Sequence, residues 1–167
     1  MLIVLLVPIS ARSLASGPVT IDDCEDLYLP ESVHPGKDVV WMPTPDYLVD
    51  GMLRLAEVAV DDYLIDLGAG DGRIAIAAAR DFGARALGIE YDRDLVRLAR
   101  CMVEVERVED RVRIVEGDIF VADFSDATVL TLFLLPELNL CIRHRVLTMR
   151  PGTRVVSHHF DMAEWLV

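Results

Sequence analysis

YLIDLGAGDG, residues 63–72, is the stretch that decides the fold of this 167-residue chain. Its first half, Tyr63–Leu67, is a short apolar segment typical of a buried strand. Three glycines follow at alternate positions, Gly68, Gly70 and Gly72, whereas a plain turn into a helix usually needs only one. A helix that begins beside such a loop presents free N–H groups to a ligand. The stretch therefore predicts a strand, a ligand-binding glycine loop and a helix.

Strands and helices alternate on both sides of this loop. The predicted strands are Tyr63–Leu67, Ala86–Glu90, Val112–Val115, Ala127–Leu135 and Arg154–Ser157. The predicted helices are 46–59, Arg73–Asp81, Arg93–Val108 and Glu137–Met149. Apolar strands joined by helices indicate a parallel sheet covered on both faces, built with right-handed crossovers. We therefore expect an α/β fold of the Rossmann-like, doubly wound type, with a parallel sheet of about five strands.

The segment before this domain has a different composition. Residues 1–17 begin with an apolar run that resembles the core of a signal peptide, although no Lys or Arg precedes it. The run is too short for a transmembrane helix, which needs about 20 apolar residues. Residues 18–45 predict an irregular lead-in with one short helix near Asp22–Leu27, and residues 46–167 predict the folded domain.

The composition is that of a globular protein, with 53% hydrophobic residues and a formal net charge of −12 at pH 7. Binding to phosphates needs clustered Lys and Arg, so this charge argues against a general nucleic-acid binder. The three cysteines, Cys24, Cys101 and Cys141, contain no CxxC pair. We therefore expect reduced, partly buried thiols and neither a disulfide framework nor a zinc site.

The spacing of the glycines distinguishes between nucleotide ligands. A dinucleotide site prefers GxGxxG, but Arg73 stands where the third glycine would be, and the loop reads GxGxG after Asp66. A phosphate-binding P-loop is excluded because no Gly-Lys-Ser/Thr follows. The loop therefore fits a cofactor without a pyrophosphate better than it fits NAD.

Two carboxylates follow the next two predicted strands. Glu90 lies about 20 residues after the loop, where a carboxylate can accept both hydroxyls of a ribose. Asp118 follows the third strand, where it could accept the exocyclic amine of an adenine while Ile119 or Phe120 covers the ring. Ligands of doubly wound sheets bind at the carboxyl ends of the strands, so the loop and both carboxylates predict one nucleoside site.

With these motifs the sequence resembles the class I S-adenosylmethionine-dependent methyltransferases. The resemblance rests on residues 66–72, on Gly88-Ile89-Glu90 and on Gly117-Asp118-Ile119-Phe120. It is closer still to a bacterial group similar to the mitochondrial lysine methyltransferases that modify the c-ring protein of the ATP synthase and the adenine nucleotide translocase. That likeness is carried by Trp41-Met42-Pro43-Thr44-Pro45, by Asp71-Gly72-Arg73-Ile74 and by TLFLLPELN at residues 131–139.

The resemblance implies S-adenosylmethionine as the cofactor and no metal. The residues expected around the cofactor are Thr44, Asp66, Gly68, Ala69, Gly70, Glu90, Asp118, Ile119 and Thr131. The glycine loop is expected along the methionine part, with Thr44 at its carboxylate. Glu90 is expected at the ribose and Asp118 at the adenine. Thr131 stands where many members carry an Asn-Pro-Pro-Tyr type motif, whose absence disfavours methylation of amide, adenine or glutamine nitrogens.

The function that the resemblance implies is methyl transfer, with a protein lysine as one possible acceptor. A non-catalytic module that binds S-adenosylmethionine and an NAD-dependent oxidoreductase are the alternatives. A full class I sheet has an antiparallel hairpin after strand five, but only ten residues follow Ser157, so we expect the hairpin to be missing and strand five to be an open edge. The cofactor favours a cytoplasmic location, whereas residues 1–16 leave an export signal open.

No residue of the sequence is an obvious general base for the methyl acceptor. His158 and His159 follow the fifth predicted strand on the expected substrate side, and one of them is a candidate for the acceptor pocket. His144 is expected on a helix surface. Trp41 and Phe133 are candidates for apolar walls of the same pocket.

Overall fold

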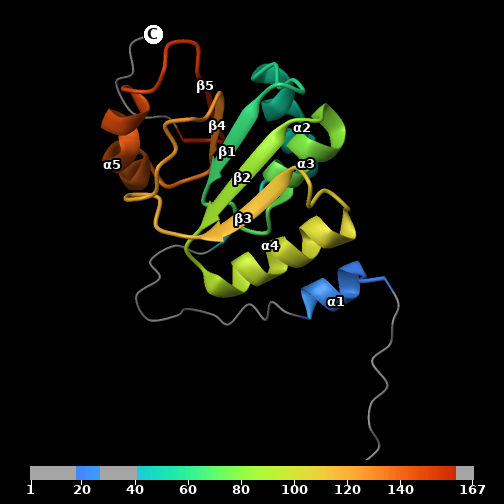
Figure 1. Cartoon of the computed structure of the whole chain (residues 1–167). Coiled ribbons are helices and arrows are strands. Elements are labelled where there is room, and N and C mark those ends of the chain that lie inside the picture. Colours follow the sequence, from blue (N-terminus) through green and yellow to red (C-terminus); the bar gives the residue numbers. More distant parts are fainter. Residues whose placement is uncertain (1–17, 27–40, 161–167) are drawn as a thin grey trace, which may run out of the picture.

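The computed structural model of the chain describes residues 18–26 and 41–160, which form one α/β unit (Figure 1). The predictions for residues 1–17, for most of the lead-in before Trp41 and for the residues after Phe160 lie outside the described residues. In the described part, no helix is long and apolar enough to cross a membrane.

A five-stranded parallel sheet of order β3-β2-β1-β4-β5 forms the centre of the molecule (Figure 1). Its strands are β1 (Tyr63–Leu67), β2 (Arg85–Glu90), β3 (Val112–Glu116), β4 (Val129–Leu132) and β5 (Arg154–Ser157). The chain first builds outward from β1 to β3 and then returns to place β4 on the other side of β1. The direction of winding therefore reverses between β1 and β4, which is where such sheets bind ligands.

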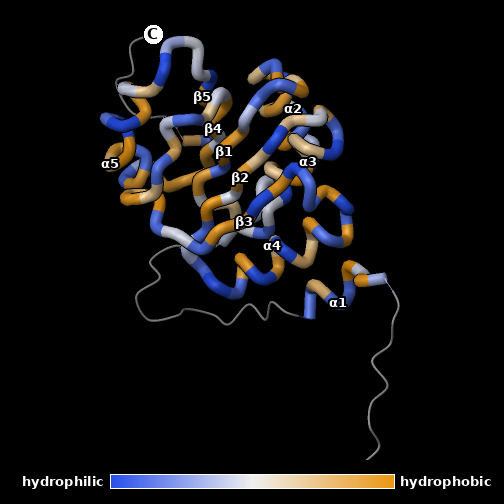
Figure 2. The backbone as a smooth tube through the Cα atoms, in the orientation of Figure 1, coloured by the Kyte–Doolittle hydropathy of each residue, from blue (hydrophilic) through white to orange (hydrophobic). Residues whose placement is uncertain are grey.

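Helices cover both faces of this sheet. They are α1 (Ile21–Glu25), α2 (Asp46–Leu55), α3 (Arg73–Phe82), α4 (Arg93–Val105) and α5 (Pro136–Val146). Alternate residues of β1 enter two separate cores: Leu64 packs with the residues of α2, α3 and α4, and Ile65 packs with α5 through Ile142. The hydrophobic colour along β1 and β4 in Figure 2 follows from this burial on both faces. The Rossmann-like, doubly wound prediction is confirmed.

The predicted helices 46–59 and Arg93–Val108 both run past the observed ends of α2 and α4 for the same reason. Each helix ends in a turn whose next residue has a positive φ, 49° at Glu57 and 57° at Arg107. The following apolar residue is buried, and its N–H bonds back to a carbonyl inside the helix. Val58 and Val108 thus continue the apolar spacing of a helix that has already ended.

The fourth strand is shorter than its apolar sequence predicts. The prediction of Ala127–Leu135 is wrong at both ends, because β4 covers only Val129–Leu132. The apolar residues after it leave the sheet and lead into α5, which starts with a proline at its first position, Pro136. By contrast, Tyr63–Leu67 and Arg154–Ser157 are confirmed to the residue.

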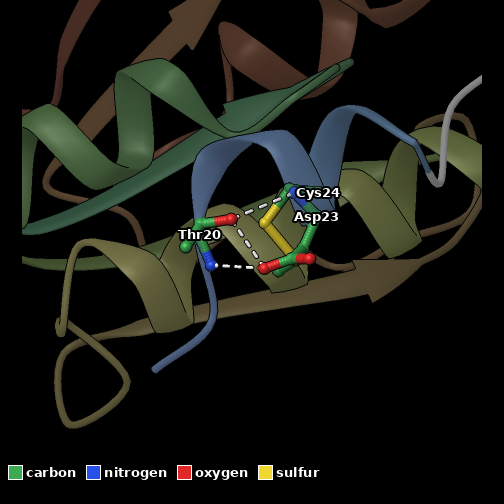
Figure 3. The surroundings of a disulfide bond; sticks show 4 residues. Thr20, Asp23 and Cys24 are labelled. Carbon is green, nitrogen blue, oxygen red and sulfur yellow. Dashed lines mark hydrogen bonds between the residues drawn. A yellow bond between two sulfur atoms is a disulfide. The ribbon is translucent and has the colours of Figure 1, made fainter. Parts of the chain in front are cut away.

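The cysteines contradict the sequence prediction. Cys24 and Cys101 form a disulfide that joins α1 to α4, while Cys141 is free and exposed. The bond lies beside the start of α1, where the Thr20 and Asp23 side chains cap each other's backbone N–H groups (Figure 3). The prediction of reduced thiols failed because the bonded cysteines are 77 residues apart, and sequence spacing carries no information on such a pair.

Candidate active site

The glycine loop after β1 is held against the end of β2 by backbone contacts. The N–H groups of Gly68 and Ala69 both donate to the carbonyl oxygen of Ile89, at 2.9 and 3.1 Å. Gly88 permits this approach, because a Cβ at that position would lie 2.8 Å from the Cβ of Ala69. The loop predicted to bind the cofactor is therefore fixed by the protein's own backbone.

Glu90 ends β2 as predicted, and only 9% of it is exposed. Its Oε2 accepts the N–H of Gly70 and its Oε1 accepts the N–H of Asp92, both at 2.8 Å. Each carboxylate oxygen has two lone pairs, so one remains on each oxygen for a ribose hydroxyl. Glu90 can hold a ribose as expected, and it also fixes the glycine loop, a role that the sequence did not reveal.

Asp66 and Thr131 form a buried pair between β1 and β4. The Thr131 hydroxyl donates to Asp66 Oδ1 at 2.7 Å, and the two residues are 2% and 0% exposed. Burial raises the pKa of Asp66 to about 7, against the opposing effect of the bond from Thr131. A buried carboxyl of this kind is ionised most easily beside a positive charge, so this end of the site suits a cationic ligand group. Thr131 reaches the site through Asp66.

Arg73 joins the glycine loop to the segment before α2. Its Nε lies 3.0 Å from both carboxylate oxygens of Asp71, and its Nη1 donates to the carbonyl oxygen of Thr44 at 3.0 Å. Thr44 itself is 4% exposed. Trp41 lies against the same loop, because a Cβ on Gly70 would be only 2.4 Å from Trp41 Nε1. The segment is thus docked on the loop at two points.

The predicted adenine side is more open. Asp118 is half-buried, and its Oδ1 accepts the N–H of Phe120 at 2.8 Å. Of the two residues proposed to cover an adenine, Ile119 belongs to the core and Phe120 is 42% exposed. A shallow depression of about 390 Å³ lies here, lined by Tyr91, Arg93, Glu116, Gly117 and Asp118. It has the place expected for the base, at the carboxyl ends of β2 and β3.

Arg145 of α5 holds the loop that carries Asp118. Its guanidinium donates to the carbonyl oxygens of Ile119 and Phe120, at 3.1 and 3.0 Å, and also to that of Ala122. It lies 4.2 Å from the centre of the Phe124 ring. Sequence reasoning missed Arg145 and the docking role of Arg73, because both act on backbone carbonyls that lie far away along the chain.

Three rings gather at the carboxyl ends of β4 and β5, on the predicted acceptor side. The rings of Phe133 and His158 have centroids 4.1 Å apart, and Phe160 stacks on Phe133 at 6.3 Å. Burial lowers the pKa of His158. His144 is exposed on α5, as expected. Within residues 18–26 and 41–160, no three His, Cys, Asp or Glu side chains are grouped as a metal site.

The sheet order, the glycine loop after β1 and the buried carboxylate that ends β2 together define the class of S-adenosylmethionine-dependent methyltransferases. The comparisons with known proteins agree. A family model described as the ANTKMT methyltransferase domain matches residues 66–167, and the chain belongs to that family.

Individual relatives support the same assignment. The chain is 43% identical over 129 residues to a protein-lysine N-methyltransferase of Saccharolobus islandicus (strain REY15A), covering 76% of this chain and 80% of that protein. It is 30% identical over 103 residues to the Homo sapiens lysine N-methyltransferase of the ATP synthase c-ring protein, covering 61% of this chain and 44% of that enzyme. The chain thus spans most of the first relative and less than half of the second.

A solved structure extends the comparison to three dimensions. An RNA methyltransferase from Salinibacter ruber, in complex with S-adenosyl-L-homocysteine, is 52% identical with a TM-score of 0.73, covering 75% of this chain and 82% of that chain. The predicted class, fold and cofactor are therefore confirmed, and the chain is an S-adenosylmethionine-dependent methyltransferase. Neither the non-catalytic module nor the oxidoreductase receives any support.

The described residues fit this cofactor. Glu90 keeps lone pairs for the ribose, and the buried Asp66 suits the cationic methionine part. Asp118 faces the depression at the adenine side. Thr44 lies beside the glycine loop, where it would contact the carboxylate. The individual assignments of these residues stay predictions, because they rest on the resemblance and on the geometry together.

Proposed function

We propose that the chain transfers the methyl group of S-adenosylmethionine to the side-chain amine of a protein lysine. The observation that carries this proposal is the wall of neutral rings formed by Phe133, His158 and Phe160 at the carboxyl ends of β4 and β5. A lysine has a long apolar stem and a cationic head, and both associate favourably with aromatic rings. The names of the Saccharolobus islandicus and Homo sapiens relatives point to the same acceptor.

When bound, the cofactor supplies a methyl group on a sulfonium, which a nucleophile displaces in line. The protein's part is then to hold donor and acceptor in the right alignment. Glu90 and the glycine loop hold the nucleoside side, and their mutual hydrogen bond keeps them in register. The Thr131 hydroxyl orients Asp66 toward one geometry at the methionine side. The ring wall excludes water from the acceptor nitrogen, which makes its neutral form easier to reach.

An RNA nitrogen is a second candidate acceptor, because the Salinibacter ruber relative is described as an RNA methyltransferase. The electrostatics favour a protein. The chain has 28 Asp and Glu against 16 Lys and Arg, which repels a polyanion and attracts a basic protein surface.

The test compares the two acceptors in one reaction. The protein is incubated with S-adenosylmethionine labelled with tritium in its methyl group and an extract of cells that encode it. Protein is then hydrolysed to amino acids and RNA to nucleosides. We expect label in methyllysine and its absence with Glu90→Ala. Label in methylated nucleosides alone would overturn the proposal.

A further inference from the structure

The position of His158 is fixed at the acceptor end of the sheet. It directly follows β5, and its backbone N–H donates to the carbonyl oxygen of Leu132 in β4 at 2.8 Å. Its ring packs against Phe133, the residue that follows β4, with 4.1 Å between the centroids. The imidazole is therefore placed beside the point where β4 ends, next to the wall assigned to the acceptor.

A hydrogen bond to Thr44 orients the imidazole. His158 Nδ1 lies 3.2 Å from Thr44 Oγ1, across 114 residues of sequence. Thr44 cannot easily move away, because Arg73 binds its carbonyl oxygen and the residue is 4% exposed. A threonine hydroxyl can accept from Nδ1–H while it donates its own proton elsewhere. In that arrangement the other ring nitrogen, Nε2, carries no proton.

The charges around the ring keep it neutral. Burial lowers the pKa of His158, and a positive charge on His159, whose ring lies 6.3 Å away, lowers it further. Arg73 adds a fixed positive charge on the far side of Thr44. Asp66, the acidic group of the neighbouring strands, is itself buried and bonded to Thr131.

We propose that His158 Nε2 accepts the proton that the acceptor ammonium must lose before methyl transfer, while Thr44 holds Nδ1–H. This inference rests on the proposed lysine acceptor. In the first step an ammonium N–H bond breaks and an Nε2–H bond forms. The freed lone pair then forms the N–CH₃ bond as the C–S bond breaks, which leaves neutral S-adenosylhomocysteine and a methylated ammonium. The imidazolium finally releases its proton to water.

The first test measures the tautomer of His158 and requires no acceptor. Long-range ¹H–¹⁵N correlation spectra of the ¹⁵N-labelled protein with S-adenosylhomocysteine identify which ring nitrogen carries the proton, and the His158→Asn spectrum assigns the signal. We expect a neutral ring at pH 7 with its proton on Nδ1. A proton on Nε2, or a charged ring at pH 7, would overturn the proposal.

The second test measures initial rates of methyl transfer to the labelled protein fraction between pH 6 and pH 10. His158→Asn keeps an N–H close to the position of Nδ1 and can still bond Thr44, but it cannot take up a proton. We expect its rate to fall about 100-fold at pH 7, the scale of general-base catalysis. The loss should shrink to less than about fivefold at pH 10, near the lysine pKa of about 10.4, where the amine deprotonates without help.

His144→Gln, on the exposed face of α5, is the matched control and should behave as the wild type. The dissociation constant of S-adenosylhomocysteine should stay within about threefold for His158→Asn, because the change leaves the nucleoside contacts intact. A loss of equal size at every pH would contradict proton transfer by His158. A wild type that labels no lysine would refute the proposed acceptor instead, and the tautomer measurement would still decide the arrangement of His158.

Discussion

The two ends of the cofactor site are built in different ways. At the methionine and ribose end, Glu90, Asp66 and Thr44 are each at most 9% exposed, and each is bonded to another part of the protein. At the adenine end, Tyr91 is 67% exposed, and the ion pair between Arg93 and Glu116 lies in solvent. One end is an interlocked set of buried polar groups, and the other is a shallow surface depression.

This difference assigns different tasks to the two ends. Buried polar groups that are fixed in advance lose little freedom when a ligand binds, so they contribute most to affinity. Exposed charges contribute little, because water and salt screen them. We therefore expect substitutions at the methionine and ribose end to weaken cofactor binding more than substitutions at the adenine end. Four variants test this order.

Glu90→Ala should have the largest effect. It removes the carboxylate that faces the ribose and the acceptor for the N–H groups of Gly70 and Asp92. Hydrogen bonds to a charged group contribute about 1.5–3 kcal/mol, so the dissociation constant of S-adenosylhomocysteine should rise about 10- to 150-fold in calorimetric titration. Glu109→Ala, on the surface, is the control. An unchanged constant would place the ribose elsewhere.

Arg73→Lys should weaken binding by about tenfold, which corresponds to about 1.4 kcal/mol. Lysine keeps the charge, but it lacks the planar fork that contacts Asp71 and the Thr44 carbonyl at once. Arg54→Lys changes an exposed ion pair with Asp50 on α2 and should leave the constant as it is. Equal constants for the two variants would show that the docked segment does not contribute to cofactor binding.

Arg145→Lys tests the adenine end and should cost about threefold in the same titration. The variant loses the contacts to at least two of the three carbonyls of the loop after Asp118, but that loop is partly exposed and its carbonyls can bind water instead. Arg150→Lys, whose exposed ion pair is with Asp126, is the control. A loss larger than that of Arg73→Lys would reverse the proposed order of the two ends.

Asp66→Asn should have the smallest effect, a change of a few degrees in the melting temperature. With a folded-state pKa of about 7 against the ordinary 3.8, Asp66 keeps its proton in the folded chain and loses it in the unfolded chain between these values. Wild-type stability from this group therefore falls as the pH rises from about 4 to about 7. Asparagine does not titrate and can still accept from Thr131.

The melting temperature of Asp66→Asn relative to the wild type should therefore increase across this pH range and then stay constant. Other titrating groups, such as Asp81, whose pKa is lowered by the hydrogen bond from Arg80, are present in both proteins and cancel in the difference. A difference that does not change with pH would show that Asp66 is ionised throughout.

How much the sequence could predict depends on the range of the interactions. Tyr63–Leu67 was predicted to the residue because its apolar pattern and the glycines after it act locally. The position of Glu90 followed from its spacing to the loop. The bond from Gly70 to Glu90, the Arg145 contacts and the disulfide depend on chain segments that only folding brings together. These long-range contacts leave no periodic signal in one sequence.

The disulfide divides the molecule by the way its parts lose order. The covalent ring closed by Cys24 and Cys101 contains β1, the glycine loop and Glu90, but not the Asp118 loop or His158. In the chain-entropy model, a ring of this size restricts the unfolded ensemble by about 4.5 kcal/mol. The restriction acts on the half that holds the ribose and methionine. The half that carries the acceptor wall has no such cross-link among the described residues, so it can open as a separate, less stable unit while the cofactor half stays folded.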